Sequence, residues 1–216
     1  MSGGTVLAAV ALVAAAYLIG SIPFGVIAAR LAGGPDPRTI GSGRTGGTNA
    51  LRALGRWWAL FVVTGDVLKG AVPVLLARLV TGEASVEVAC GLAAVLGAVR
   101  SIYLGFHGGR GVGTGVGTML VICPLAVVLS TPVFFGVIAL TGYVSLGSLL
   151  GSAAMIPWTA LILGLSGDPD LGIRVAYVVV GVGLIWWAHA DNIDRLRRGS
   201  ERRLDLGLLL GRRPTE

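Results

Sequence analysis

Charged residues are scarce in this chain of 216 residues: they make up 13% of it, whereas hydrophobic residues make up 54%. The mean hydropathy is +0.83. A soluble globular domain has roughly a quarter of its residues charged, so this composition excludes that class and predicts an integral membrane protein. The sequence has no polar linker and no internal repeat. We therefore expect a single domain over residues 1–216.

Cysteine and histidine are also rare, with two of each. Cys90 and Cys123 lie inside apolar runs, without CxxC spacing and without a neighbouring histidine. This pattern excludes the common zinc and redox motifs. The Gly-Lys-Ser/Thr end of a nucleotide-binding phosphate loop is absent as well. We expect no metal and no cofactor.

Acidic residues are outnumbered by basic ones, 11 to 17, which gives a formal net charge of +6. A basic balance can indicate nucleic-acid binding. Here the cations flank apolar runs instead of covering one soluble face, as they do beside the inner leaflet of a membrane. We expect membrane lipids as partners and no nucleic acid.

Long apolar runs dominate what is present. A helix needs about 20 mostly apolar residues to cross the hydrocarbon core. We predict an all-α, polytopic membrane helix bundle with seven transmembrane spans, or five or six if the middle region is re-entrant. The expected spans are 4–30, 57–80, 85–104, 112–130, 132–143, 146–166 and 171–188. Pro132 and Gly142 would bound the short fifth span. The first run lacks a preceding basic segment and is too long for the core of a signal peptide.

The charges between these spans divide unequally between the two faces. One face receives Arg30, Arg38, Arg44, Arg52, Arg56, Arg100, Arg110 and the basic tail from Arg195 to Arg213. The other receives Glu83, Glu87, Asp168 and Asp170, with Arg78 and Arg174 as its only cations. By the positive-inside rule we predict that the N-terminus lies outside and the C-terminus in the cytoplasm. An odd number of spans would bring three glycine- and cation-rich segments to the cytoplasmic face.

The first of these segments runs from residue 41 to residue 52 and leads into a helical stretch at 49–54. Backbone amides of a glycine-rich turn followed by a helix N-terminus can bind an anion. Arginines would add charge-assisted hydrogen bonds to a phosphate. The candidate ligands are Gly41, Ser42, Gly43, Arg44, Thr48, Asn49 and Arg52. A flexible solvated loop with scattered arginines is the alternative.

The second segment, Gly108-Gly109-Arg110-Gly111, enters the fourth expected span directly. The free amides of that helix N-terminus would face the cytoplasmic side. We expect Gly108 and Gly109 to contribute to anion binding. The following GxxxG spacing, as in Gly113 and Gly117, favours helix packing.

The third segment begins with His189 and Asn192, which are three residues apart and so share one helix face. Histidine can move a proton near neutral pH, and asparagine can orient a hydroxyl or phosphate. His189 and Asp194 also spell His-x4-Asp, a pattern of thioester-dependent glycerolipid acyltransferases. Chance gives this match with odds of roughly one in fifteen, and the flanking residues fit another family better, so we discount it.

Two further candidates lie within or beside the spans. Asp66 and Lys69 are one turn apart inside the second span. Ions within a membrane are functional candidates by default, yet a pair at this spacing neutralises itself and can be structural. Ser145 follows the fifth expected span and could reach the same site.

Six motifs occur in order along the chain: SIPFG at 21–25, GSGRTGGTNALR at 41–52, DVLKG at 66–70, GFHGGRG at 105–111, YVSL at 143–146 and HADNIDRLRRGSE at 189–201. With them the chain resembles the bacterial acyl-phosphate-dependent glycerol-3-phosphate acyltransferases, integral membrane proteins that make lysophosphatidate. The resemblance covers nearly the whole chain. Each motif alone is weak, but six in order together with the matching spans are specific.

The resemblance implies roles for individual residues. Catalysis or phosphate contact would fall to Ser42 and Arg52, activity would need His189 and Asn192, the glycerol 3-phosphate site would contain Gly108, Gly109 and Gly111, and structural integrity would need Glu201. Arg110, which we expect to bind phosphate, stands where the family usually has lysine; the positive charge is kept, but a planar guanidinium replaces a single ammonium. The resemblance also implies a multi-pass protein of the bacterial inner membrane with its active site facing the cytoplasm.

Three positions depart from the family pattern. Arg44 stands in place of the usual asparagine, Ala98 lies in a stretch that usually reads Gly-His-x-Phe-Pro, and Ala190 replaces a basic residue. These differences keep open a changed acceptor or a changed activity.

The leading hypothesis is therefore an enzyme that moves a fatty acyl group from acyl phosphate to the 1-hydroxyl of glycerol 3-phosphate. The alternatives are a paralogue that acylates another phosphorylated acceptor or binds lipid without turnover, and a transporter of a small phosphate ester. The sequence leaves the oligomeric state, the general base and the acyl-chain preference open.

Overall fold

The computed structural model describes residues 3–204 of the chain. It contains helices and no strand, which confirms the predicted all-α class. The helices are α1 (Gly3–Gly20), α2 (Phe24–Ala32), α3 (Gly47–Leu54), α4 (Arg56–Thr81), α5 (Ala84–Val99), α6 (Val112–Ile122), α7 (Pro124–Thr141), α8 (Val144–Leu165), α9 (Leu171–Ala188) and α10 (Ala190–Arg197). Arg212 and Arg213, which we assigned to the cytoplasmic tail, lie outside this range.

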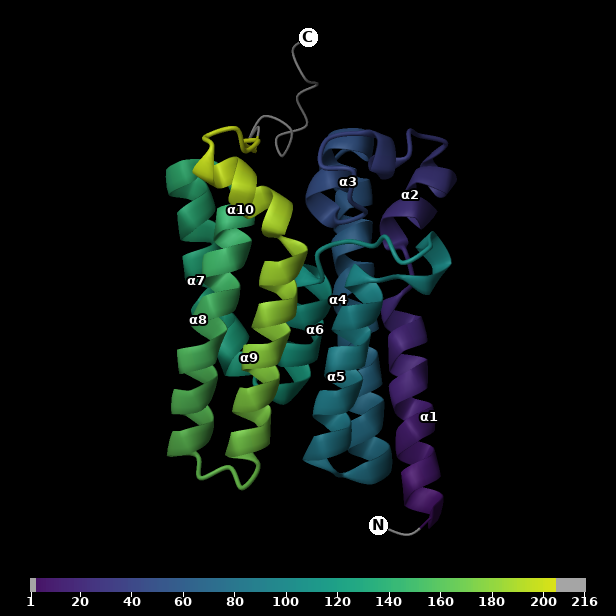
Figure 1. Ribbon diagram of the computed structural model, residues 1–216, viewed down its shortest axis with the longest axis vertical. Coiled ribbons are helices and arrows are strands. Elements are labelled where there is room, and N and C mark those ends of the chain that lie inside the picture. The colour runs from purple at the N-terminus through teal and green to yellow at the C-terminus, as the bar shows by residue number, and fades with distance from the viewer. Residues whose placement is uncertain (1–2, 205–216) are drawn as a thin grey trace.

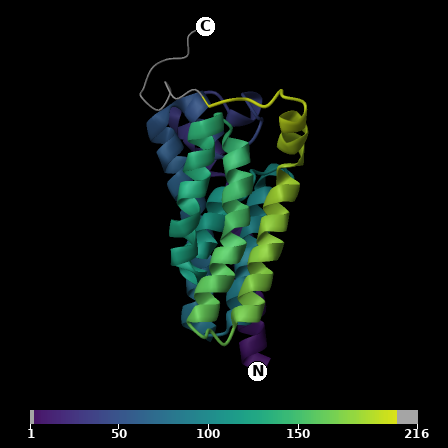
Figure 2. The same ribbon diagram turned by 90° about the vertical axis from the view of Figure 1, so that its left-hand side faces the viewer.

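The long helices run roughly parallel to one axis in two groups, with α6 between them (Figure 1). One group contains α1, α4 and α5, and the other contains α7, α8 and α9, which face the viewer in Figure 2. Helix α1 begins at one end of the bundle, whereas α2, α3 and α10 lie at the opposite end (Figure 1). The start of α1 and helix α10 therefore lie at opposite ends of the bundle, which is compatible with an odd number of crossings, while the orientation of the two ends stays a prediction.

Five helical segments are long and apolar enough to cross a membrane: Arg56–Thr81, Ala84–Leu104, Pro124–Thr141, Val144–Leu165 and Leu171–Ala188. The first expected span is a pair of helices, Val6–Gly20 and Phe24–Ala32, bent by 41° at a break. Helix α6 has only 11 residues and falls short of an ordinary span. The count of seven spans stays a prediction.

The break in the first span has a local cause. Pro23 has no N–H and disfavours helical geometry at Ile22, so the helix stops there. The Lys69 ammonium donates a hydrogen bond of 3.0 Å to the Ile22 carbonyl. This contact satisfies a backbone group that a continuous helix would have paired.

The predicted boundary in the middle of the chain was wrong. We expected helices at 112–130 and 132–143, but α6 ends at Ile122 and α7 runs from Pro124 to Thr141 with Pro132 inside it. Proline fits the first turn of a helix because its missing N–H has no partner there, and Pro124 takes that position. Membrane helices tolerate an internal proline such as Pro132 because neighbouring groups satisfy the freed carbonyl. The predicted end at Gly142 was correct.

Glycines bring α4 and α6 into backbone contact. A Cβ on Gly117 would lie 1.9 Å from the Val67 carbonyl oxygen, and one on Gly70 would lie 2.1 Å from the Thr114 carbonyl oxygen. Only glycine permits such an approach. The GxxxG spacing in α6 therefore serves packing, and it places the start of α6 beside Asp66 and Lys69.

Candidate active site

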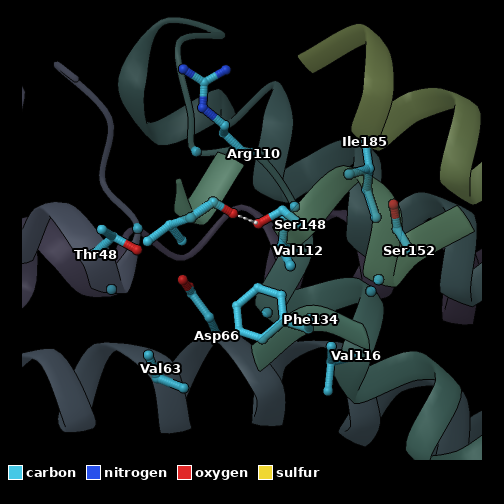
Figure 3. A pocket seen from close by; sticks show the side chains of 18 of the residues that line it. Thr48, Val63, Asp66, Arg110, Val112, Val116, Phe134, Ser148, Ser152 and Ile185 are labelled. Atoms are coloured by element: carbon cyan, nitrogen blue, oxygen red, sulfur yellow. Dashed lines mark hydrogen bonds between the residues drawn. The ribbon is translucent and has the colours of Figure 1, made fainter. Parts of the chain in front are cut away.

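A cavity of about 1020 Å³ lies between the two helix groups. One part is polar and the other is apolar, and Figure 3 shows Thr48, Asp66 and Arg110 in the polar part with Val116 and Phe134 farther along. All three segments singled out in the sequence contribute to the wall of this cavity. The three segments therefore meet at one cavity, as we expected.

The first segment is shaped by Asn49, whose side chain is 2% exposed. Its Nδ2 group donates to the carbonyls of Ile40 and Arg44, both at 2.9 Å, and also to that of Pro37. Its Oδ1 atom accepts a hydrogen bond of 3.2 Å from the Ser42 amide. We expected Asn49 to contact phosphate, but these bonds engage its amide within the loop.

Gly41 permits this arrangement without lining the cavity itself. Its φ of +56° lies in the left-handed region, and a Cβ there would lie 2.3 Å from Asn49 Oδ1. Gly43 also lies outside the cavity wall. These two glycines therefore shape the loop, in contrast to the expected contact with phosphate.

The loop presents Ser42, Arg44, Thr48 and Arg52 to the cavity. Within residues 3–204 neither Arg44 nor Arg52 forms an ion pair. Burial lowers the pKa of both guanidinium groups, and neighbouring arginines, Arg110 for Arg44 and Arg202 for Arg52, lower it further. Two half-buried, unpaired cations favour an anion in this part of the cavity. Arg44 is one of the positions at which this chain departs from the pattern of the family it resembles.

The second segment differs from expectation. The amides of Gly108 and Gly109 donate to the carbonyls of Val99 and Ala98, at 3.0 and 2.8 Å, and so complete the end of α5. These two N–H groups are therefore not free for an anion, and Gly108 does not line the cavity. A glycine-rich motif does not reveal from sequence alone which amides a neighbouring helix end will use.

Free backbone amides instead lie at the start of α6, directly after this segment. Gly111 caps α6, and the first bond of that helix runs from the Gly115 amide to the Gly111 carbonyl, 2.7 Å. The amides of residues 112–114 precede the first possible acceptor in the helix, and in the described chain they have no other partner. All three residues line the cavity. Their amides carry the positive end of the helix dipole.

Arg110, which we expected to bind phosphate, is paired with Asp191. Its Nη1 and Nη2 groups donate to the two carboxylate oxygens at 2.6 and 2.9 Å, and Nη1 also contacts the Ala188 carbonyl. Arg195 donates to the same carboxylate at 3.2 Å. The Arg110 guanidinium is the main reason why the pKa of Asp191 lies well below its usual range. The sequence signal for Asp191 was limited to its i,i+4 spacing with Arg195.

His189 is 2% exposed and lines the cavity. Its Nδ1 atom lies 2.8 Å from the Ile185 carbonyl oxygen. A carbonyl only accepts hydrogen bonds, so Nδ1 carries the proton and Nε2 keeps its lone pair. Burial, reinforced by Arg110, lowers the pKa of His189 to about 4. The imidazole is therefore a neutral base at pH 7.

Asn192 is also buried, and its two amide atoms have different environments. Nδ2 donates to Glu201 at 2.6 Å, whereas Oδ1 has no partner in the described part of the chain. Because a carboxylate cannot donate, this contact fixes which end of the amide is the oxygen. A buried acceptor without a donor is costly, and a ligand hydroxyl would satisfy it.

Glu201 joins three elements. Besides Asn192, it accepts hydrogen bonds from Ser145 Oγ at 2.9 Å and from Arg195 Nε at 2.7 Å. Burial alone would raise the pKa of this carboxyl, but the three donors outweigh it and hold the pKa below its usual value. The predicted structural role of Glu201 fits this geometry. Ser145, expected at the substrate, donates to Glu201.

Asp66 and Lys69 both line the cavity and pair at 2.7 Å. Lys69 also holds the Ile22 carbonyl, so the pair links the break in the first span to α4. Figure 3 shows the Asp66 carboxylate and Thr48 directed toward the same part of the cavity. The pair therefore neutralises itself and fixes the cavity wall, in keeping with the structural alternative.

Comparison with known proteins identifies the group to which this arrangement is similar. The family model described as "Glycerol-3-phosphate acyltransferase" matches residues 10–199. A glycerol-3-phosphate acyltransferase of Geobacter sulfurreducens is 43% identical over 192 residues, 89% of this chain and 95% of the relative. One from Geobacter metallireducens is 46% identical over 193 residues, with the same coverage. One from Thermus thermophilus is 44% identical over 189 residues, 88% of this chain and 92% of the relative.

Two crystal structures of PlsY (YgiH), an integral membrane glycerol 3-phosphate acyltransferase, are also similar. The glycerol 3-phosphate form has a TM-score of 0.84 and 36% identity, and covers 95% of this chain and 100% of PlsY. The lysophosphatidic acid form has a TM-score of 0.82 and 35% identity, with the same coverage.

Proposed function

The chain belongs to the glycerol-3-phosphate acyltransferase family, and we propose on that premise that it transfers a fatty acyl group from acyl phosphate to the 1-hydroxyl of glycerol 3-phosphate. The products are lysophosphatidate and inorganic phosphate. The observation that carries this proposal is one cavity that combines unpaired cations, a neutral imidazole and a long apolar section. Each part matches one requirement of the reaction.

The two unpaired guanidinium groups account for the two phosphates. Arg44 and Arg52 lie in the same cavity, and neither has an acidic partner in the part of the chain that the structure describes. Both substrates carry a phosphate, and bringing two anions together requires compensating charge. Ser42 and Thr48 add neutral donors beside them.

The apolar section accounts for the acyl chain. Val116, Met119, Phe134, Ile138 and Val182 line it. The cavity wall also includes Leu60 and Phe135, which are 56% and 62% exposed. An acyl phosphate could therefore enter sideways from the lipid while glycerol 3-phosphate arrives from the aqueous end.

The chemistry requires that the two reactants are held in contact and that one proton can leave the attacking hydroxyl. The glycerol oxygen attacks the acyl carbon, the bond from that carbon to the phosphate oxygen breaks, and phosphate leaves. Acyl phosphate is an activated anhydride, so no covalent enzyme intermediate is needed. Holding both reactants in contact can supply several kcal/mol, up to about 7–11 in ideal cases.

The residues divide the remaining tasks. Asn192 Oδ1 accepts a hydrogen bond from the attacking hydroxyl, and His189 Nε2 or the leaving phosphate takes its proton. The free amides at the start of α6 stabilise negative charge that develops on the acyl oxygen. Only the attacking hydroxyl and the group that takes its proton, His189 or the leaving phosphate, need to change their protonation state.

The distribution of charge supports a location for the protein. The chain is a multi-pass membrane protein, and we assign it to the bacterial inner membrane with the cavity opening to the cytoplasm. The arginines concentrate at the end of the bundle that carries the three segments, which supports this orientation.

The test is product formation. Purified protein incubated with palmitoyl phosphate and glycerol 3-phosphate should yield lysophosphatidate and phosphate, and Arg52→Ala should reduce kcat/KM by at least about a hundredfold. Formation of no more lysophosphatidate by the wild type than by Arg52→Ala would count against the proposal. A product seen only with another phosphorylated alcohol would instead favour a changed acceptor.

A further inference from the structure

The hydrogen bonds of Arg110 use part of its guanidinium and leave the rest unengaged. Nη1 donates to Ala188 and to Asp191, and Nη2 donates to Asp191. A guanidinium has five N–H groups in one plane. The Nε–H group and one Nη2–H group have no partner among residues 3–204. Nη2 is the terminal nitrogen on the same side as the Nε–H bond, so these two donors form one free edge.

We infer that Asp191 is a positioning residue for Arg110. The Asp191 carboxylate binds the guanidinium end-on, through Nη1 and Nη2, so that the Nε–Nη2 edge is directed to a substrate phosphate. This inference rests on the proposed function and assigns Asp191 a role in it. A phosphate bound side-on and a carboxylate bound end-on occupy different edges, so the guanidinium can hold both at once. Asp191 therefore orients the cation without competing for the ligand.

The surroundings of Asp191 fix it for this task. It lies in the first turn of α10, and Arg195, one turn later, donates to the same carboxylate at 3.2 Å. Arg195 is held in turn by Glu201 at 2.7 Å. Arg110 lowers the pKa of Asp191, which favours the charged carboxylate. The pair links loop 105–111 to α10 across 81 residues of sequence.

Arginine is required for this arrangement. An ammonium presents three donors around one nitrogen and has no separate edges, so a carboxylate and a phosphate would share the same point charge. A lysine at position 110 would lose most of the orienting effect of Asp191. The coupling between positions 110 and 191 therefore distinguishes positioning from a merely structural role of Asp191 in anchoring α10.

The experiment is a double-mutant cycle on the full-length protein with Asp191→Asn, Arg110→Lys and the double variant. We expect Asp191→Asn to lower kcat/KM by about tenfold or more in the wild-type background, mostly through KM, and by less than about threefold in the Arg110→Lys background. Asp191→Glu should recover part of the loss because it restores the carboxylate. Equal factors in both backgrounds, or an Asp191→Asn variant as active as the wild type, would overturn the inference.

A matched control and a second readout keep the result decisive. Asp194→Asn removes a carboxylate from the same helix that pairs, within the described chain, only with the exposed Arg198, and it should leave kcat/KM unchanged. The same cycle is measured as the rise in Tm with glycerol 3-phosphate or inorganic phosphate, which reports binding without turnover. Failure of the wild type to make lysophosphatidate would refute the proposed function but leave this readout. No rise in Tm for the wild type, or one that Asp191→Asn preserves, would refute the positioning.

Discussion

At the scale of single residues, the structure separates side chains that face the cavity from those that hold them in place. Ser42, Arg52, His189 and Asn192 line the cavity, as the residue types and spacing predicted. Asn49 and Ser145 also lie in the cavity wall, but their polar side-chain atoms are engaged in hydrogen bonds within the protein. Both kinds of residue are polar and lie in the same motifs, so sequence alone cannot assign them to one role or the other.

The buried imidazole yields a prediction about pH. The pKa of His189 is lowered from 6.5 to about 4, so the folded protein resists protonation that the unfolded chain accepts. Between these values the unfolded chain binds more protons, and the free energy of unfolding therefore decreases as pH falls from 6.5 toward 4. We expect His189 to stay neutral down to about pH 4.

The measurement is the imidazole chemical shift, followed by NMR in a His107→Gln variant, which leaves His189 as the only histidine. A midpoint near 6.5 would contradict the prediction and would mean that the site is hydrated. The proton-accepting role would then depend on pH in the physiological range.

At the scale of elements, the helix types and most boundaries were predictable, and the middle of the chain was not. The apolar runs located α4, α5, α8 and α9 to within a few residues because hydropathy and length fix a span. The boundary between α6 and α7 was predicted wrongly because of two prolines. Pro132 suggests a break when read locally, but a packed bundle tolerates it, whereas Pro124 marks the true start of α7.

The contact between α4 and α6 yields a prediction about stability. Gly117→Ala would place a Cβ 1.9 Å from the Val67 carbonyl, so the two helices must separate, and we expect a loss of about 1–3 kcal/mol. Gly136→Ala in α7 is the matched control, because a Cβ there meets nothing within 4 Å. Alanine also favours the helix, so this control should be neutral or slightly stabilising.

Thermal unfolding in detergent, followed by tryptophan fluorescence, compares the two variants. A Gly117→Ala protein as stable as Gly136→Ala would show that the two helices do not pack through their backbones. The position of the α6 N-terminus, and with it the source of the free amides, would then need another explanation.

At the scale of the whole molecule, the cavity opens toward one end and does not reach the other. Among the described residues, none that lines it comes from the far ends of α4, α5 or α9. That far end is tied together by ion pairs between Arg78 and Glu87 at 2.8 Å and between Arg174 and Asp168 at 3.0 Å. A transporter needs a polar path through the protein, so this arrangement favours the enzyme over the transport alternative.

The same ion pairs sharpen the charge asymmetry, and with it the last prediction. They neutralise both cations of the far end and leave Glu83 and Asp170 there, while the end with α3 and α10 keeps a large excess of arginine. By the positive-inside rule we predict that Ser200 lies in the cytoplasm and Glu83 outside. Both residues are exposed. Cys90 and Cys123 are buried, so engineered thiols can be labelled selectively.

A membrane-impermeant maleimide should therefore label Glu83→Cys but not Ser200→Cys in intact bacterial spheroplasts, and the reverse in inverted membrane vesicles. Detergent should make both variants reactive, which controls for thiols that are merely inaccessible. Labelling of Ser200→Cys from the outside would show that the whole bundle has the opposite orientation. The cavity would then open away from the cytoplasm, and the orientation that we propose for the active site would be wrong.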